Sequence, residues 1–511
     1  MSILRQKYPT QLLLLGIQKA GGNPELSKSQ TIIGRVAEKL VLDRVLASKD
    51  PELLAVYGRR RVGKTFLIRE HLKDRIVFEV AGMHEQSTSS QLAGFHAALR
   101  RAFPAVASVQ PRTWLDAFEI LRTCLDQTSK SKHKRVVFFD EFPWLATRKS
   151  NFLAAFENFW NDYAARHRDL AVVICGSAAA WMIRNVVNSR GGLHNRLTRR
   201  MRLEPFNLNE VGLYLQSRKI NWDQRQIATL YMAFGGIPHY LNLIRPGQSA
   251  SQCIDAECFR PEGMLRLEYH NLYAALFENY RTHEAIVKTL AARNSGLTRD
   301  QLIEQSQLTS GGGVTKAIEE LALSGFLTET LALDKKAKSS LLRLTDEFSV
   351  FYWDWMHSNT AANSWMRQAT SRRYEAWCGY AFESICFKHI KEIQRALGIA
   401  EVDSHVASWH YSAKKGSQEE GAQIDLLLDR ADHCIDLCEI KFSDKPFTIT
   451  KSYAESLARK IRVFRERSGR QQTLFLTMIT PYGVAPNRYS EQLVNKQVTL
   501  SDLFGSEKTG P

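Results

Sequence analysis

The sequence predicts a multidomain α/β protein, with a parallel sheet in its N-terminal half and a smaller α/β domain towards its C-terminal end. Three observations support this fold class. The chain has 511 residues, which is too many for one compact core. Apolar runs of strand length alternate with amphipathic helices in the first half. Strand-like and helical segments return between residues 374 and 500.

Four apolar runs predict the strands of the first sheet. They are Leu53–Gly58, Arg75–Gly82, Arg135–Glu141 and Leu170–Ser177. Each run is apolar without alternation, as in a parallel strand that helices cover on both faces. We therefore expect a three-layer αβα domain over residues 30–206. A polar leader, 1–29, precedes it, and a helical lid, 207–280, follows it.

Residues 281–350 predict a winged helix-turn-helix domain. Apolar spacing indicates three helices between residues 283 and 327, with Thr298 capping the second and Gly311–Gly313 opening the third. Two strands then flank a basic turn, the wing. The remaining expected segments are a helical connector at 351–373, the α/β domain at 374–500 and a tail at 501–511.

Composition narrows the class of protein and of partner. A net charge of +16 and a pI near 9.4 indicate an anionic partner, with nucleic acid first and a membrane surface second. The eight cysteines include no C-x-x-C pair, which favours reduced thiols and a cytoplasmic protein. We expect Cys434 and Cys438 to pack in the core beside Ile440 rather than bind zinc. The longest apolar runs are far shorter than the roughly 20 residues of a membrane helix, so no membrane contact is expected.

The stretch GRRRVGKT matches the phosphate-loop pattern G-x-x-x-x-G-K-S/T. Gly58 and Gly63 allow the backbone to approach phosphates closely, and the following helix directs N–H groups at them. Lys64 would place its charge at the β- and γ-phosphates, and Thr65 would offer a hydroxyl to Mg²⁺. Because a strand precedes the loop and a helix follows it, the sequence predicts a P-loop NTPase domain that binds ATP.

Two acids end the third apolar run. Asp140 and Glu141 would lie at the carboxyl end of a parallel strand, which is where open α/β sheets bind ligands. Asp140 would hold Mg²⁺ through water, and Glu141 would polarise the attacking water. The pair favours hydrolysis over nucleotide switching alone. Ser177, after the fourth run, is either a contact to the γ-phosphate or a turn residue.

The motifs between about Thr31 and Asp346 resemble those of archaeal-type ATPases of the STAND branch, relatives of AAA+ proteins. They are IIGR, GRRRVGKT, FFDEF, ICGS, NRLTRRMRLEPF and GGIPHYL. The resemblance implies that Arg35 lies near the nucleotide and that Gly236–Pro238 lies near the base. Where family members commonly have Gly-Arg, this chain has Asn195-Arg196. Arg196 is the candidate charge-stabilising arginine, with Arg199, Arg184 or none as alternatives. The full set expected at the nucleotide is Arg35, Gly58, Arg59, Arg60, Arg61, Val62, Gly63, Lys64, Thr65, Phe66, Asp140, Ser177 and Pro238.

Near the C-terminus, a second group of acids suggests metal chemistry. Asp425 lies on one apolar run, and Glu439 and Lys441 share a face of the next. A hairpin would bring Asp425 beside Glu439, and two convergent carboxylates suit Mg²⁺ or Mn²⁺. A lysine beside such an ion can orient or deprotonate a metal-bound water. This is the chemistry of phosphodiester cleavage.

The pattern D…E-x-K resembles the PD-(D/E)xK, restriction-endonuclease-like fold. The resemblance implies that Glu383 is the acid of the first helix of that fold and that such nuclease-like tails follow this ATPase type. Gln423 stands where many members have a glutamate, which leaves the number of metal ligands open. A degenerate domain that binds DNA without cutting it is the alternative.

These observations predict an ATPase coupled to a Mg²⁺-dependent DNA nuclease, of the kind found in defence or mobile elements. The alternative is a STAND-type regulatory switch, in which a homo-oligomer forms and the tail only binds. A remodelling or transport ATPase fits less well. Candidate phosphate-binding residues are Lys335, Lys336 and Lys338 in the wing, and Lys414, Lys415, Arg459, Lys460, Arg462, Arg465 and Arg467 near the nuclease-like motif. The third helix carries only Lys316 as a positive charge, so the winged helix is alternatively a rigid spacer that packs on the ATPase.

Overall fold

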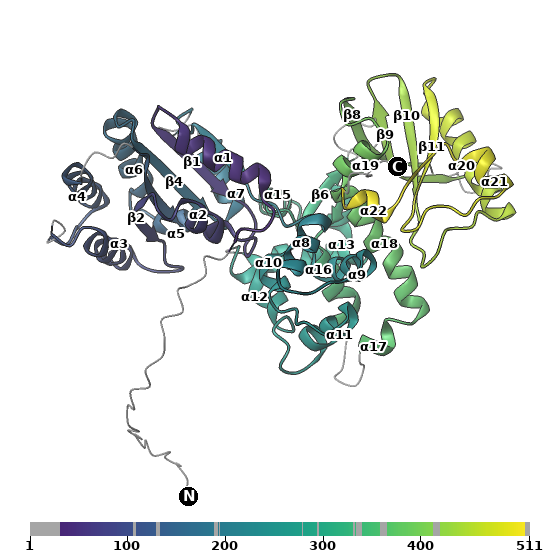
Figure 1. Cartoon of the computed structure of the whole chain (residues 1–511), viewed down its shortest axis with the longest axis horizontal. Helices are drawn as coiled ribbons and strands as arrows, with labels where there is room; N and C mark the ends of the chain where they lie inside the picture. Colours follow the sequence, from purple (N-terminus) through teal and green to yellow (C-terminus); the bar gives the residue numbers. More distant parts are fainter. Residues whose placement is uncertain are drawn as a thin grey trace, which may run out of the picture. The chain divides into compact units, whose positions relative to one another are not determined.

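The computed structural model describes most of the chain beyond the leader (Figure 1). The described residues are 31–505, except 106–108, 129–132, 189–192, 194, 278, 294–295, 331–332, 334–339, 358–364 and 412–419. Several expectations fall outside this range: the leader 1–29, the wing lysines Lys335, Lys336 and Lys338, the pair Lys414 and Lys415, and the last six residues of the tail.

The N-terminal sheet is parallel throughout, as the apolar runs predict. Its strands are β1 (Glu52–Tyr57), β2 (Ile76–Ala81), β3 (Arg135–Asp140), β4 (Leu170–Gly176) and β5 (Arg199–Arg202), in the order β2-β3-β4-β1-β5. The first four confirm the predicted strands. Sequence reasoning did not predict β5, because its run of arginines lacks the apolar pattern of a buried strand.

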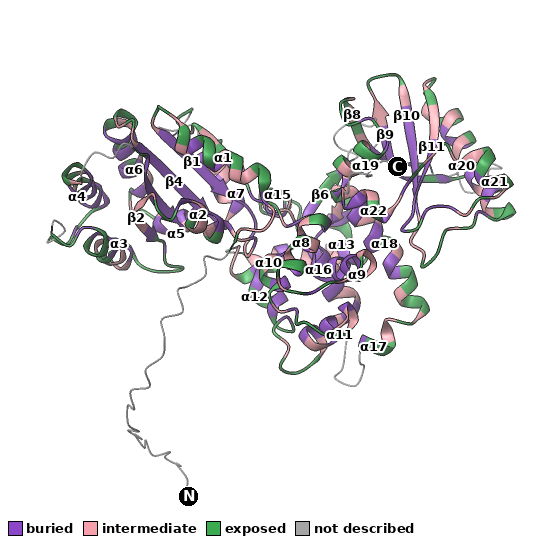
Figure 2. Ribbon diagram, viewed as in Figure 1, coloured by how far each residue is buried: buried purple, intermediate pink, exposed green. Residues whose placement is uncertain are grey.

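Helices cover both faces of this sheet. Along β1, Leu54 and Val56 join one apolar cluster, while Leu53 and Ala55 join another. Because successive strand residues point to opposite faces, each cluster marks one covered face. The helices of this half are α1 (Val36–Ala47), α2 (Lys64–Leu72), α3 (Thr88–Ala102), α4 (Trp114–Gln127), α5 (Phe142–Leu145), α6 (Phe152–Asp162) and α7 (Ala179–Met182). The central strands β1, β3 and β4 are accordingly buried along their length, whereas the edge strands β2 and β5 are only partly buried (Figure 2).

A helical segment and a small hairpin follow. The helices are α8 (Leu208–Ser217), α9 (Gln224–Phe234), α10 (Pro238–Leu241), α11 (Ala250–Ile254), α12 (Glu268–Ala274), α13 (Tyr280–Ala291), α14 (Arg299–Ser306) and α15 (Gly312–Leu323). Strands β6 (Leu327–Thr330) and β7 (Leu341–Leu344) pair antiparallel. Thr298 caps α14 and Gly311 precedes α15, as the spacing predicts.

The second sheet is mixed, in the order β12-β11-β10-β9-β8. Its strands are β8 (Ser404–Tyr411), β9 (Ala422–Arg430), β10 (Cys434–Ile440), β11 (Thr473–Ile479) and β12 (Lys496–Val498). The pairings β8–β9 and β9–β10 are antiparallel, and β10–β11 and β11–β12 are parallel. Helices α16 (Glu347–Phe351), α17 (Trp365–Gln368), α18 (Arg372–Lys388) and α19 (Ile390–Ala396) precede the sheet, and α20 (Lys451–Ser468), α21 (Arg488–Leu493) and α22 (Leu500–Leu503) follow β10.

The two faces of this sheet also pack on different helices. Leu426 and Leu428 share a cluster with Phe382 of α18, whereas Leu427 shares one with Phe464 of α20. The predicted hairpin between the runs that carry Asp425 and Glu439 is confirmed as β9–β10. In the part of the chain that the structure describes, no helix is both long and apolar enough to cross a bilayer.

Candidate functional site

The phosphate-loop motif connects β1 to α2, and its two glycines are required by geometry. Gly58 has φ +150°, and a Cβ there would stand 2.3 Å from the main-chain oxygen of Leu203. Gly63 has φ +89° and immediately precedes the first residue of α2. The loop thus ends in the N-terminal turn of a helix, whose free N–H groups and dipole favour an anion.

Lys64 is buried inside this loop. Its Nζ donates hydrogen bonds to the main-chain oxygens of Gly58, at 3.1 Å, and Arg59, at 2.8 Å. Burial lowers the pKa of Lys64, against the attraction of Cys175, Glu141 and Asp140. The ammonium therefore lies within the loop that would surround the phosphates, as its motif position predicts.

The carboxyl ends of β3 and β4 bring the other motif residues to the same edge of the sheet. Thr65 Oγ1 donates to Asp140 Oδ2 at 2.9 Å, so the two predicted Mg²⁺ contacts are adjacent. Glu141 has φ +44° and its main-chain N–H donates to Asp140 Oδ1 at 3.0 Å. A hydroxyl and a carboxylate are oxygen ligands of the type that Mg²⁺ prefers.

Glu141 also contacts Ser177, at the end of the neighbouring strand. The hydroxyl of Ser177 donates to Glu141 Oε2 at 2.7 Å, and its main-chain N–H donates to the same oxygen at 3.1 Å. Sequence reasoning expected Ser177 at the γ-phosphate or in a turn, but here it holds the expected water-polarising acid. The contact depends on β3 and β4 being neighbours, which the sequence does not state.

Arg35 lies against the same loop. Its Nη2 donates to the main-chain oxygen of Val62 at 3.1 Å, and its guanidinium stands 4.4 Å from the ring centre of Phe206. Phe206 in turn packs on Gly236. A Cβ at Gly236 would stand 1.8 Å from the main-chain oxygen of Phe206. Pro238 is the first residue of α10. The residues that the resemblance places near the nucleotide are thus linked by packing.

Two loop arginines have partners far along the chain. Arg59 pairs with Asp346, and its guanidinium lies 4.5 Å from the ring centre of Phe326. Arg61 pairs with Glu268, which is buried. These side chains are therefore engaged by later segments, and the loop offers its main chain to a nucleotide. Of the other two expected positions, Arg60 is half-buried and Phe66 is exposed on α2.

The ion pair of Arg59 and Asp346 is almost fully buried. The two side chains are 4% and 2% exposed. Burial would raise the pKa of Asp346, but Arg59 and then Ser349 hold it below its ordinary value. The Nε and Nη2 atoms of Arg59 have no hydrogen-bond partner among the described residues. Much of the environment of this arginine therefore depends on one carboxylate.

The C-terminal carboxylates meet at the β9–β10 hairpin. Cys438 pairs with Leu426 in register, so Glu439 and Asp425 follow at adjacent positions. Glu439 contacts three donors: Lys441 at 3.0 Å, Lys460 at 2.6 Å and the hydroxyl of Tyr453 at 2.7 Å. Asp425 and Glu439 are both buried. The sequence predicted that a hairpin brings the two acids together, but it did not predict the contacts of Tyr453 and Lys460 with Glu439.

Glu383, on α18, joins these acids. Burial and then Asp425 raise the pKa of Glu383 to about 7. Burial and then Glu439 raise the pKa of Asp425. Buried carboxyl groups that repel one another provide oxygen ligands of the type that a divalent cation prefers. Among the described residues, however, no group of three or more His, Cys, Asp or Glu side chains is arranged to hold a metal ion.

A comparison with protein families identifies the N-terminal segment. Residues 34–244 match the model of an ATPase domain found predominantly in Archaea. The segment is an archaeal-type ATPase domain. An uncharacterized protein of Methanocaldococcus jannaschii is 22% identical over 438 residues, which are 84% of this chain and 92% of that protein.

Two solved structures are similar to this chain at low identity. The Walker-type ATPase of Pyrococcus abyssi is 17% identical, with a TM-score of 0.48, over 62% of this chain and 95% of that one. The ORC2 protein of Aeropyrum pernix, in ADPNP–ADP complexes, is 14% identical, with a TM-score of 0.39, over 72% of this chain and 96% of that one.

The candidate charge-stabilising arginines of the ATPase domain differ in their surroundings. Arg196 is exposed. Arg199 pairs with Glu52 at 3.1 Å, at the start of β1 and so at the edge of the sheet opposite the phosphate loop. Arg184 is tied to α15. Of the three, Arg196 is the one whose side chain has no described ion pair.

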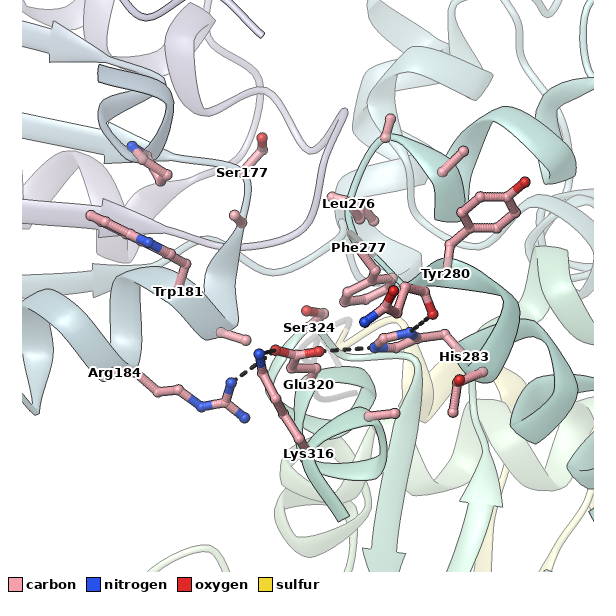
Figure 3. A pocket seen from close by; sticks show the side chains of 18 of the residues that line it. Ser177, Trp181, Arg184, Leu276, Phe277, Tyr280, His283, Lys316, Glu320 and Ser324 are labelled. Atoms are coloured by element: carbon pink, nitrogen blue, oxygen red, sulfur yellow. Dashed lines mark hydrogen bonds and ion pairs between the residues drawn. The ribbon is translucent and has the colours of Figure 1, made fainter. Parts of the chain in front are cut away.

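A cavity of about 1300 Å³ separates the ATPase domain from α13 and α15 next to Ser177 (Figure 3). Arg184 crosses it to Glu319 and Glu320, at 2.6 and 2.8 Å. Glu320 also contacts His283, at 3.0 Å, and Lys316, at 3.8 Å. Lys316 therefore neighbours a carboxylate that already binds Arg184.

The expected basic surface near the nuclease-like motif is largely engaged within the protein. Lys460 binds Glu439, Arg462 binds Glu420, and Arg465 donates to the main-chain oxygen of Gln472 at 2.7 Å. Arg459 donates to Ser456 at 3.3 Å, and Arg467 lies 5.0 Å from the ring centre of Tyr411. Arg459, Arg462 and Arg467 are exposed on α20, so the prediction that these side chains form a phosphate-binding surface stays a prediction.

Proposed function

We propose that this protein hydrolyses ATP with the ATPase domain of residues 34–244. The observation that carries the proposal is the contact of Thr65 with Asp140, beside buried Lys64 and beside Glu141. Lys64 would bind the phosphates and Thr65 and Asp140 the Mg²⁺ ion. Glu141 would accept the proton of the attacking water.

The test is phosphate release by the full chain, with two variants. Lys64→Ala should abolish ATP binding and turnover, because the phosphate charge loses its cation. Glu141→Gln should keep ATP binding but lower kcat by roughly 10²–10⁴-fold, the usual contribution of general base catalysis. Arg69→Gln, on the exposed side of α2, is the matched control. Full turnover in Glu141→Gln would contradict the assignment of the base.

We further propose that the C-terminal domain is a metal-dependent DNA nuclease. The mixed sheet carries Asp425, Glu439 and Lys441 at one place, with Glu383 from α18 beside them. These acids would hold Mg²⁺ or Mn²⁺, and Lys441 would orient a water molecule. A bound ion would polarise the scissile phosphate and its water.

Cleavage of plasmid, linear and single-stranded DNA tests the nuclease, with Mg²⁺ or Mn²⁺ and with or without ATP. Lys441→Ala should abolish cleavage and leave ATP turnover unchanged. Lys445→Ala is the control, since that lysine is exposed and close in sequence. Cleavage by Lys441→Ala at the wild-type rate would remove the nuclease assignment and leave the ATPase intact.

A second function, a regulatory ATPase whose tail binds without cutting, is favoured by one observation. Glu439 already binds Lys441, Lys460 and Tyr453, so an ion would compete with these donors for its oxygens. In this case no metal should stimulate DNA cleavage, and Glu141→Gln should hold the protein in its ATP-bound state. A nuclease driven by hydrolysis should instead lose activity in that variant.

DNA and a second copy of the chain are the partners that this proposal includes. Helices α13–α15 and the β6–β7 hairpin have the order of a winged helix, which would bind duplex DNA. Exposed Arg196 would reach the nucleotide of a neighbouring copy in a homo-oligomer. Arg196→Ala should then lower turnover most at protein concentrations that favour assembly.

A further inference from the structure

Arg343 carries a positive charge towards the acids of the C-terminal domain. It lies on β7, in the hairpin that follows α15, and its guanidinium stands 5.1 Å from the ring centre of Phe387 on α18. Phe387 is one helical turn after Glu383. The Nε atom of Arg343 is buried without a hydrogen-bond partner among the described residues.

The same arginine faces Glu383 across a small space. Arg343 and Glu383 both line a cavity of about 30 Å³, together with Thr330, Ser384 and Phe387. Burial lowers the pKa of Arg343, while the charges of Glu383 and Asp425 raise it. Because this buried guanidinium has an N–H without a hydrogen-bond partner, its charge is stabilised mainly by electrostatic attraction to the buried acids.

Positive side chains already act on the acids at this place. Three acids, Glu383, Asp425 and Glu439, face three bases, Arg343, Lys441 and Lys460. Lys441 and Lys460 bind Glu439 directly and also act on Asp425, whereas Arg343 adds its charge to that of Lys441 at Glu383. A divalent cation entering among these acids would therefore meet a resident positive charge.

We propose that Arg343 is a built-in competitor of the divalent cation, supplied by the β6–β7 hairpin, and that it keeps the C-terminal carboxylates from binding metal while the hairpin is docked. This inference rests on the proposed metal site of the nuclease-like domain. The hairpin has a second tie: Asp346, three residues after Arg343, pairs with Arg59 of the phosphate loop. Displacement of this segment would move both contacts together.

The test is Mn²⁺ binding to the full chain without nucleotide, followed by electron paramagnetic resonance of free Mn²⁺. Arg343→Met keeps the apolar stem over Phe387 and removes the charge, so Mn²⁺ affinity should rise at least about tenfold. Arg343→Gln should behave alike, and Arg343→Lys, which keeps the charge, should match the wild type. Adding Asp425→Asn to Arg343→Met should abolish the gain, which locates the ion. Thermal unfolding of each variant verifies folding.

Two outcomes separate this inference from the nuclease proposal. If Arg343→Met or Arg343→Gln, once shown to be folded, binds Mn²⁺ no more tightly than the wild type, the competition is refuted, whatever DNA cleavage shows. If either binds Mn²⁺ more tightly through Asp425 but cuts no DNA, the competition stands and the nuclease assignment fails.

Discussion

Replacing Asp346 with Asn should destabilise the protein more than the loss of an ordinary ion pair. Asn keeps the capping of α16, so the change removes little more than the charge. The guanidinium of Arg59, 4% exposed in its side chain, would then be buried without a counter-charge. Removing one partner of such a pair costs about 3–5 kcal/mol of the free energy of unfolding.

The assay is urea unfolding at pH 7, with Glu79→Gln as the control. Arg69 and Glu79 also form an ion pair, but their side chains are 52% and 29% exposed, so the control should lose under about 1 kcal/mol. Because Arg59 holds the pKa of Asp346 low, the wild type should keep its advantage above the ordinary carboxyl pKa of 3.8 and lose it as the pH falls through the lower folded value. Equal effects of the two substitutions would refute the reasoning.

Three further predictions concern single side chains. Ala at Gly58 would place Cβ 2.3 Å from the main-chain oxygen of Leu203, so ATP binding, measured by calorimetry, should be lost. Ala at Ser177 removes one of two hydrogen bonds to Glu141, so kcat for ATP hydrolysis should fall about tenfold at unchanged KM; an unchanged kcat would show that the main-chain contact suffices. Burial raises the pKa of Asp354 to about 6, so the wild type should lose stability as the pH rises from 4 to 7. Asp354→Asn should therefore be more stable than the wild type by about 1–2 kcal/mol at pH 7.5 and gain little at pH 4. Thermal unfolding at both pH values measures the difference.

The parallel sheet of the ATPase domain could be predicted because its signals are local. Continuous apolar runs mark strands buried on both faces, and the glycine pattern between one such run and a helix marks the phosphate loop. β5 was not predicted because it lacks such a local apolar signal. Its arginines belong to the sheet because the strand pairs with β1, and a local apolar pattern does not indicate that pairing.

Contacts between distant segments could not be predicted from the same signals. Asp346 and Glu268 read as ordinary charged residues of helical regions, yet they pair with Arg59 and Arg61. Lys460 has the spacing of a solvated base on α20, and only the fold brings it to Glu439. In each case burial, rather than residue type, decides the role of the charge.

The partners of Arg59, Arg61 and Arg184 lie beyond residue 244, where the match to the ATPase family model ends. A fragment that stopped there would expose the apolar surroundings of these arginines and leave each without its carboxylate. These ion pairs therefore join residues inside the family match to residues outside it. Truncation after residue 244 should yield a protein prone to aggregation. Activity assays on such a fragment would underestimate the activity of the whole chain.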